Sequence, residues 1–151
     1  MPETPLPSFD HFDQGVADAM MRANDADAGL PGFLGIKFAS FAPGRLTATM
    51  EVRRELLNPF GSMHGAVMAS IVDHCLGCVL YPLMQRGQWA ATTEFKLNYL
   101  AAVRHGALRA EATVLSMTKR TAVVRVEVLN GERLACIAQG TVLIVDPPAK
   151  Q

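Results

Sequence analysis

The sequence predicts an α+β fold in which one antiparallel sheet of five to six strands wraps around a single long helix. Three observations lead to this prediction. A long apolar stretch runs from about Gly65 to Met84, and its near-uniform apolarity fits a helix that is covered on most sides. Beyond Gly87 the apolar residues recur with a period of two, which is typical of strands. The connections between these strands are short, and strands joined by tight turns pair antiparallel.

The elements in front of the long helix are shorter. Apolar residues recur at helical spacing from about Phe9 to Asp27, which predicts an amphipathic helix. Gly29, Pro31 and Gly32 are then expected to break the chain. We therefore divide the chain into an N-terminal extension with a short helix, residues 1–33, and a main domain, residues 34–147.

The six strands are expected at residues 35–42, 46–52, 89–100, 107–118, 122–130 and 134–145. Two turn signals support this assignment. Pro43-Gly44 separates the first two strands, and Asn130-Gly131 is a strong tight-hairpin signal between the last two.

Composition excludes several classes of function. The 151 residues suffice for one domain with a real core, and 14 basic residues balance 14 acidic ones. Such a weak net field argues against nucleic-acid and anionic-membrane partners. Asp73 and Pro82 interrupt the apolar stretch, which argues against a membrane span. The first residues show no signal-peptide pattern and the three cysteines make an odd count, so we expect a cytoplasmic protein.

Cys75 and Cys78 have the spacing of a redox or zinc motif. A single pair inside an apolar helix is weak support for such a site, and buried core cysteines are the favoured interpretation. Adjacent helical positions diverge by about 100°, so Asp73, His74 and Cys75 cannot converge on one ligand. No metal and no cofactor are therefore expected.

Asp73 is the only formally charged residue between Glu55 and Arg86. Burying a carboxylate is costly, so a functional role for Asp73 is favoured. The structural alternative is a side chain that only accepts a hydrogen bond or points into a water-filled gap. Its neighbours on the same helical face are small, so this face either packs closely on a sheet or leaves space for a ligand. These neighbours are Ala66, Ala69, Ser70 and Gly77.

Asn58, His64 and Gly65 precede and open this helix. A helix start presents unpaired N–H groups and the positive end of the dipole, and glycine there would let a substrate oxygen approach the main chain. An oxyanion forming at that point would be stabilised. Taken singly, each residue also has an ordinary role in a turn, a helix start or a buried hydrogen bond.

Helical spacing constrains how these groups can act together. Gly65 and Asp73 are eight residues apart, which is about 12 Å along a helix axis. One chain cannot easily place both on one reacting centre. Two chains related by a two-fold axis can, so the spacing favours an obligate oligomer.

The pattern Asn58-x-x-Gly61-x-x-His64-Gly65, followed by Asp73, resembles the hotdog-fold acyl-CoA thioesterases. The resemblance is to the PaaI-type, phenylacetate-pathway group of the 4-hydroxybenzoyl-CoA thioesterase superfamily, and it covers residues 34–145. It includes residues 92–100 and 138–140. It implies a hotdog fold, a homodimer with shared active sites and a further pairing into a homotetramer.

The resemblance also implies roles for individual residues. The Gly65 N–H would polarise the thioester carbonyl, Asn58 would orient the carbonyl or the attacking water, and His64 would support the loop and the Asn58 side chain. Asp73 of the neighbouring subunit would act as general base or nucleophile, and Thr92 would help to hold the water. Many members have a second glycine where this chain has alanine at position 66, which should narrow the pocket slightly.

Substrate contacts follow from the same comparison. Lys119 and Arg120 resemble a turn that contacts the phosphates of coenzyme A, and Arg104 is a second candidate. Ordinary exposed turn charge is an equally weighted alternative for all three. For the acyl pocket we expect Phe60, Met63, Met68 and Tyr99.

The sequence thus predicts an enzyme that hydrolyses acyl- or aryl-CoA thioesters to the free acid and coenzyme A. The alternative is a non-catalytic acyl-CoA sensor that uses the same groove. The joint presence of Asp73, Asn58 and Gly65 favours catalysis, because binding alone does not require the acid. A hydratase is disfavoured, since the short Asp and His motif typical of hotdog hydratases is absent before the helix.

Overall fold

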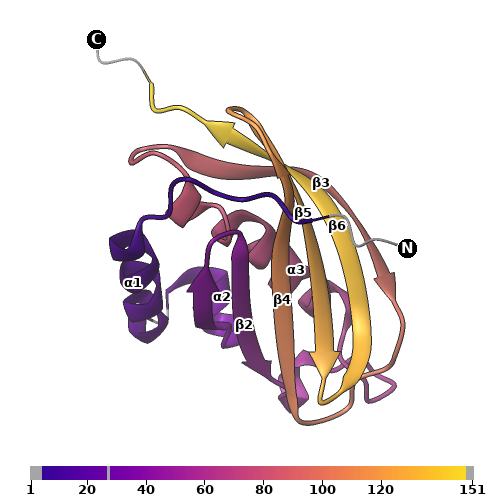
Figure 1. The fold of residues 1–151 in the computed structure, drawn as a ribbon. Coiled ribbons are helices and arrows are strands. Elements are labelled where there is room, and N and C mark those ends of the chain that lie inside the picture. Colours follow the sequence, from indigo (N-terminus) through magenta and orange to yellow (C-terminus); the bar gives the residue numbers. More distant parts are fainter. Residues whose placement is uncertain (1–4, 27, 149–151) are drawn as a thin grey trace.

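A computed structural model describes residues 5–26 and 28–148. Its centre is a six-stranded antiparallel sheet in the order β1-β2-β4-β5-β6-β3 that curves around one helix, α3 (Figure 1). This confirms the predicted fold class. The strands are β1 (Lys37–Ala42), β2 (Arg45–Glu51), β3 (Trp89–Tyr99), β4 (Ala107–Met117), β5 (Thr121–Asn130) and β6 (Arg133–Val145). The helices are α1 (Gln14–Arg22), α2 (Gly29–Leu34) and α3 (Gly65–Cys78), and short 3-10 turns occupy Ala23–Ala26, Arg54–Leu56 and Tyr81–Leu83.

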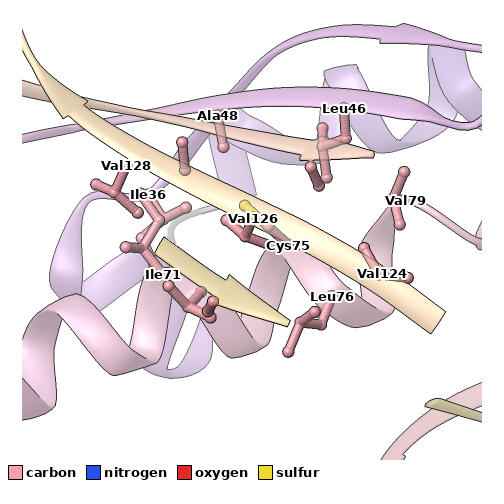
Figure 2. Close-up of a cluster of buried hydrophobic side chains, with 14 of the residues drawn as sticks. Ile36, Leu46, Ala48, Ile71, Cys75, Leu76, Val79, Val124, Val126 and Val128 are labelled. Carbon is pink, nitrogen blue, oxygen red and sulfur yellow. The ribbon is translucent and has the colours of Figure 1, made fainter. Parts of the chain in front are cut away.

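Helix α3 lies in the concave side of the sheet and carries much of the core. Figure 2 shows Ile71, Cys75 and Leu76 of the helix grouped with valines of β5. Residues Gly65–Leu83 are long and apolar enough to pass for a membrane span, but about half of this segment is buried inside the fold. The α-helix ends at Cys78, earlier than the expected end near Met84, and a 3-10 turn that contains Pro82 follows it. Proline cannot continue a helical hydrogen-bond ladder.

The N-terminal extension is fastened to the sheet and to the end of the core helix. The Asp13 side chain caps α1 by accepting a hydrogen bond from the Val16 N–H, and the Asp13 N–H donates to the Pro82 carbonyl. The Asn24 side chain bonds both the N–H and the C=O of Phe38 in β1, at 2.7 and 2.8 Å. The extension therefore packs as part of the same body.

One expectation for the extension was wrong. Gly29, Pro31 and Gly32 were expected only to break the chain, but Gly29–Leu34 forms a short helix, α2, which ends at Gly35 with φ +75°. Proline is tolerated in a first helical turn, where N–H groups lack intrahelical partners. Leu34, only 4% exposed, anchors this helix in the core.

Strand β3 lies at the edge of the sheet and pairs only with β6 in the part of the chain that is described. The prediction that strands joined by short connections pair was wrong for β3 and β4, because the chain crosses after β3 to a strand that lies between β2 and β5. The register of β3 with β6 shifts between Thr92 and Glu94. The next residue of β3, Phe95, pairs with Gly140 of β6. A Cβ atom built on Gly140 would lie 2.6 Å from the Glu94 carbonyl oxygen and 2.7 Å from the Phe95 Cβ. Glycine is therefore required where the bulged strand passes β6.

We expect Gly140→Ala to lower the free energy of unfolding by about 1–3 kcal/mol, because the clash is with backbone that cannot move freely. Gly77→Ala is the matched control. Its Cβ would meet only the Ala90 Cβ at 3.8 Å, an ordinary contact. Alanine favours a helix interior over glycine by up to about 1 kcal/mol, so this variant should be neutral or more stable. Chemical denaturation of both variants measures the difference, and equal stabilities would contradict the packing argument.

Candidate active site

His64 stands at the start of α3 and caps it. Its Nδ1 accepts a hydrogen bond from the Ala66 N–H at 3.1 Å. The Gly65 N–H lies in the first helical turn and has no hydrogen-bond partner among the described residues. A free N–H at the positive end of a helix is suited to polarise a carbonyl oxygen. Within the described part of the chain, no hydrogen bond joins His64 to the Asn58 side chain, so the expected support is not seen there.

Asn58 instead organises the loop in front of the helix. Its Oδ1 accepts from the N–H groups of Phe60, at 2.9 Å, and Ser62, at 3.3 Å, and its Nδ2 donates to the Ser62 Oγ at 3.0 Å. Both the oxygen and the nitrogen of the Asn58 side-chain amide are therefore already used in hydrogen bonds within the 58–62 loop. To orient a substrate or a water as expected, Asn58 would have to share or give up one of these bonds.

Tyr99, at the end of β3, fills the space that the missing Gly65 side chain leaves. Its hydroxyl donates to the Gly65 carbonyl at 2.8 Å, and a Cβ on Gly65 would lie 2.8 Å from the Tyr99 Oη and 2.9 Å from its Cζ. Tyr99 therefore occupies the space on the side-chain side of Gly65, and the approach of a substrate oxygen to the Gly65 N–H stays a prediction. Glycine is needed here because a tyrosine packs against the first turn of the helix.

A cavity of about 380 Å³ lies beside this helix start, and we call it the helix-start cavity. Met63 and Met68, which are 5% and 3% exposed, contribute to its wall together with Tyr99. Three of the four residues expected in the acyl pocket therefore meet here. The fourth, Phe60, is 89% exposed and does not line the cavity. The complete lining is Asn58, Ser62, Met63, Gly65, Met68, Tyr99 and residues 100–103.

A second cavity, of about 720 Å³, lies between α3 and β3, and we call it the Asp73 cavity. It brings Asp73 together with Thr92, as the candidate site requires. Of the two alternatives for the small helical face, the structure shows the open one, because Ala69, Ser70 and Gly77 line this cavity. Its other lining residues are His74, Cys78, Tyr81, Ala90, Thr93, Glu94 and Phe95.

Asp73 is exposed in the single chain. The argument from the cost of burying a carboxylate therefore does not apply to one subunit alone. What distinguishes Asp73 is its position, as the one solvent-accessible acid of α3 at the wall of the larger of the two cavities. Glu94 is a second carboxylate at the same cavity, and the sequence pattern did not single it out.

The two cavities have no lining residue in common. Gly65 belongs to one and Asp73 to the other, about 12 Å apart along α3. A single subunit thus does not bring the polarising N–H and the acid onto one reacting centre. The separation agrees with the helical-spacing argument for a site completed by a second subunit.

His74 is held in a packed setting beside Asp73. Its ring stacks on Phe38, with centroids 5.2 Å apart and planes at 13°, and its nitrogens lie 3.7 and 3.8 Å from the Cys78 Sγ. Burial lowers the pKa of His74, and the negative charge of Asp73 opposes this shift. The imidazole is accordingly neutral at pH 7.

The cysteines are positioned as packing residues. Burial raises the pKa of the Cys78 thiol to about 12 and that of Cys136 to about 11, and it raises the pKa of Cys75 as well. Thiols of this kind stay protonated at neutral pH and are poor nucleophiles. No group of histidine, cysteine and acidic residues that could hold a metal occurs among the residues searched, which are the described ones.

The basic residues that are candidates for contacting the phosphates of coenzyme A lie at opposite ends of β5. Lys119 and Arg120 are exposed on the turn before Thr121, where this strand starts. Arg104 is exposed beside the 58–62 loop, with its Nη1 3.5 Å from the Phe60 carbonyl oxygen. A strand of ten residues spans about 33 Å, so one phosphate group cannot contact both sets within one subunit.

Comparison with known proteins places this geometry in a family. Residues 60–137, which include the helix start, Asp73 and Thr92, match the model of the thioesterase superfamily. The chain belongs to this superfamily. This confirms the resemblance found in the sequence, and it identifies the sheet around α3 as a hotdog fold.

Individual relatives of this thioesterase are distant. It is 26% identical over 117 residues to the 1,4-dihydroxy-2-naphthoyl-CoA hydrolase of Listeria monocytogenes, an alignment that covers 77% of this chain and 95% of that protein. Among solved structures, a thioesterase from Haemophilus influenzae superposes with a TM-score of 0.81 at 21% identity, covering 87% of this chain and 94% of the other. The PaaI protein of the Escherichia coli phenylacetic acid degradation operon superposes with a TM-score of 0.78 at 23% identity, with coverages of 88% and 96%. At these identities the two structures show the shared fold.

Proposed function

We propose that the protein hydrolyses acyl- or aryl-CoA thioesters to the free acid and coenzyme A. Membership of the thioesterase superfamily makes it a thioester hydrolase. The relative from Listeria monocytogenes is named for hydrolysis of a CoA thioester, which supports CoA as the thiol half of the substrate. The observation that carries the proposal is the accessible Asp73 carboxylate in the same cavity as Thr92.

In the proposed reaction, Asp73 accepts a proton from a water that the Thr92 hydroxyl helps to hold. The water oxygen bonds to the thioester carbonyl carbon, and the Gly65 N–H of the other subunit stabilises the negative charge on the carbonyl oxygen. The C–S bond then breaks, and the proton returns from Asp73 to the departing thiolate. In the alternative, the carboxylate itself attacks the carbonyl carbon, and the C–S bond breaks to release the coenzyme A thiolate, which takes a proton from water. Water then hydrolyses the resulting anhydride to the free acid and restores the Asp73 carboxylate. Neither route requires a cofactor.

A two-fold dimer would supply the missing half of each site. Strand β3 is eleven residues long and presents one edge without a ladder partner in the described structure. Long unpaired edges are normally covered in native proteins, and pairing β3 with its copy would continue the sheet. Tetramer formation from two such dimers is the further assembly that we propose.

The phosphates of coenzyme A require basic contacts near the helix start that supplies Gly65. Arg104 lies beside the 58–62 loop, so it is our first candidate within that subunit. Lys119 and Arg120 lie at the other end of β5 and qualify only where a second subunit brings them close.

The proposal is tested by following thiol release from a panel of acetyl-, hexanoyl-, decanoyl-, benzoyl- and phenylacetyl-CoA. We expect steady release of free coenzyme A from at least one member, with turnover proportional to protein concentration. Tight binding without release of thiol would instead favour the acyl-CoA sensor.

A further inference from the structure

A third cavity, of about 230 Å³, lies between α2 of the N-terminal extension and the core helix α3. We call it the α2 cavity. Its α2 side is formed entirely by apolar residues: Leu30, Pro31, Leu34 and Ile36. These residues lie outside the 60–137 segment that matches the superfamily model. The cavity is therefore built by a part of the chain that the catalytic motif does not include.

The α2 cavity adjoins the candidate catalytic acid. Ser70, Asp73 and His74 line both this cavity and the Asp73 cavity, so the two cavities meet at one turn of α3. A thioester whose carbonyl lies at Asp73 can extend its acyl group into one cavity and its coenzyme A half into the other. The lining of each cavity indicates which of the two halves it binds.

The two cavities differ in the residues that face α3. On its β3 side the Asp73 cavity is lined by Thr92, Thr93 and Glu94 as well as by Ala90 and Phe95, and β3 is the edge strand where the second subunit is expected. The α2 cavity offers aliphatic side chains, and burial of apolar surface is favourable by about 25 cal/mol per Å². The acyl group, which is apolar, is therefore the half that the α2 cavity suits. This differs from the sequence-based expectation, whose residues Met63, Met68 and Tyr99 meet at the helix-start cavity.

Size limits the acyl group. A dry apolar cavity of about 150 Å³ is enough to bind benzene. The α2 cavity, at about 230 Å³, has room for one aromatic ring with a short spacer or for an aliphatic chain of similar volume. A long fatty chain does not fit within it.

We propose that α2 is the selectivity wall of the enzyme, with the acyl group of the substrate bound between Leu30 and Asp73. This inference rests on the proposed thioesterase function and names the part of the substrate that the N-terminal extension recognises. Leu34 anchors α2 with 4% of its surface exposed, whereas Leu30 is 59% exposed although it lines the cavity. Leu30 can thus be changed without removing the anchor.

The experiment compares Leu30→Trp with Phe33→Trp. Phe33 lies on the same short helix, is 70% exposed and lines none of the cavities described above, so its variant is the matched control. The readout is the kcat/KM for phenylacetyl-CoA and hexanoyl-CoA, each divided by that for acetyl-CoA. We expect a fall of at least about tenfold in this ratio for Leu30→Trp and no change for Phe33→Trp, since filling an apolar pocket by a few methylene equivalents costs this much. Leu30→Ala should shift the ratio toward larger acyl groups.

Dissociation constants for the same thioesters give the same ratio for binding alone, and calorimetry measures them in an Asp73→Asn background, in which hydrolysis is slow. An unchanged ratio in Leu30→Trp, or an equal change in both tryptophan variants, would overturn the selectivity wall. If the unmodified protein releases no thiol from any substrate, the proposed function fails. The binding ratios then still decide whether the acyl group contacts Leu30.

Discussion

Replacing Asp73 with asparagine is expected to lower kcat by about 10²–10⁴-fold, the range that a general base contributes, with KM little changed. The amide keeps the shape of the side chain but cannot take a proton from water or attack the thioester. Asp73 is exposed in the single chain, and its side chain takes part in none of the side-chain hydrogen bonds found among the described residues. Stability should therefore be almost unaffected, and the loss should lie in turnover.

Glu94→Gln is the control for this measurement, because Glu94 is the other carboxylate that lines the Asp73 cavity. It should keep kcat within a few-fold of the unmodified enzyme. Steady-state kinetics on both variants, with thermal melts to verify folding, separate the two acids. Full turnover in Asp73→Asn together with a large loss in Glu94→Gln would show that the base has been misassigned.

Gly65→Ala is expected to lower kcat by about 10²–10³-fold, which is the effect of losing one oxyanion donor. The new Cβ would lie 2.8 Å from the Tyr99 Oη, so the first turn of α3 or the Tyr99 ring must move. Either movement disturbs the Tyr99 hydroxyl to Gly65 carbonyl bond and the direction of the Gly65 N–H.

Variants of Tyr99 test whether the loss of kcat in Gly65→Ala comes from the clash between the new Cβ and the Tyr99 side chain. Tyr99→Phe removes the hydroxyl bond but keeps most of the ring, so it should cost much less than Gly65→Ala. In the double variant Gly65→Ala, Tyr99→Ala the clash is gone, and kcat should recover toward that of Tyr99→Ala alone. Equal kcat for Gly65→Ala and the unmodified enzyme would contradict the role of this helix start.

The sheet and the core helix were predictable because their signals are local. Period-two alternation, short turns and the hairpin dipeptide at Asn130-Gly131 predict the strands β3 to β6 and the antiparallel pairs β4–β5 and β5–β6. They do not predict that β3 pairs with β6 and not with β4, because this pairing joins residues far apart in the sequence. The α2 helix was not predictable in this way. Its Gly29, Pro31 and Gly32 are helix breakers by propensity, and the helix forms because Leu34 is buried at its end.

The candidate site was predictable in its residues and less so in its contacts. Tyr99 was expected to line the substrate pocket, but its bond to Gly65 joins positions 34 residues apart and leaves no sequence pattern. Ser62, four residues after Asn58, could have been found, because asparagine side chains often bond nearby backbone and hydroxyl groups in turns. The exposure of Asp73 could not, because it depends on how the edge strand passes the helix.

The central claim is that each site is shared between two subunits, and mixing two inactive variants tests it most directly. Asp73→Asn and Gly65→Ala proteins are combined in equal amounts, dissociated and allowed to reassociate. In a shared-site dimer, the mixed species has one site with both defects and one intact site, so activity should return to about a quarter of that of the unmodified enzyme. Activity that stays at the level of the two separate variants, with exchange of subunits verified by native mass spectrometry, would place Gly65 and Asp73 in one chain's site and contradict the account.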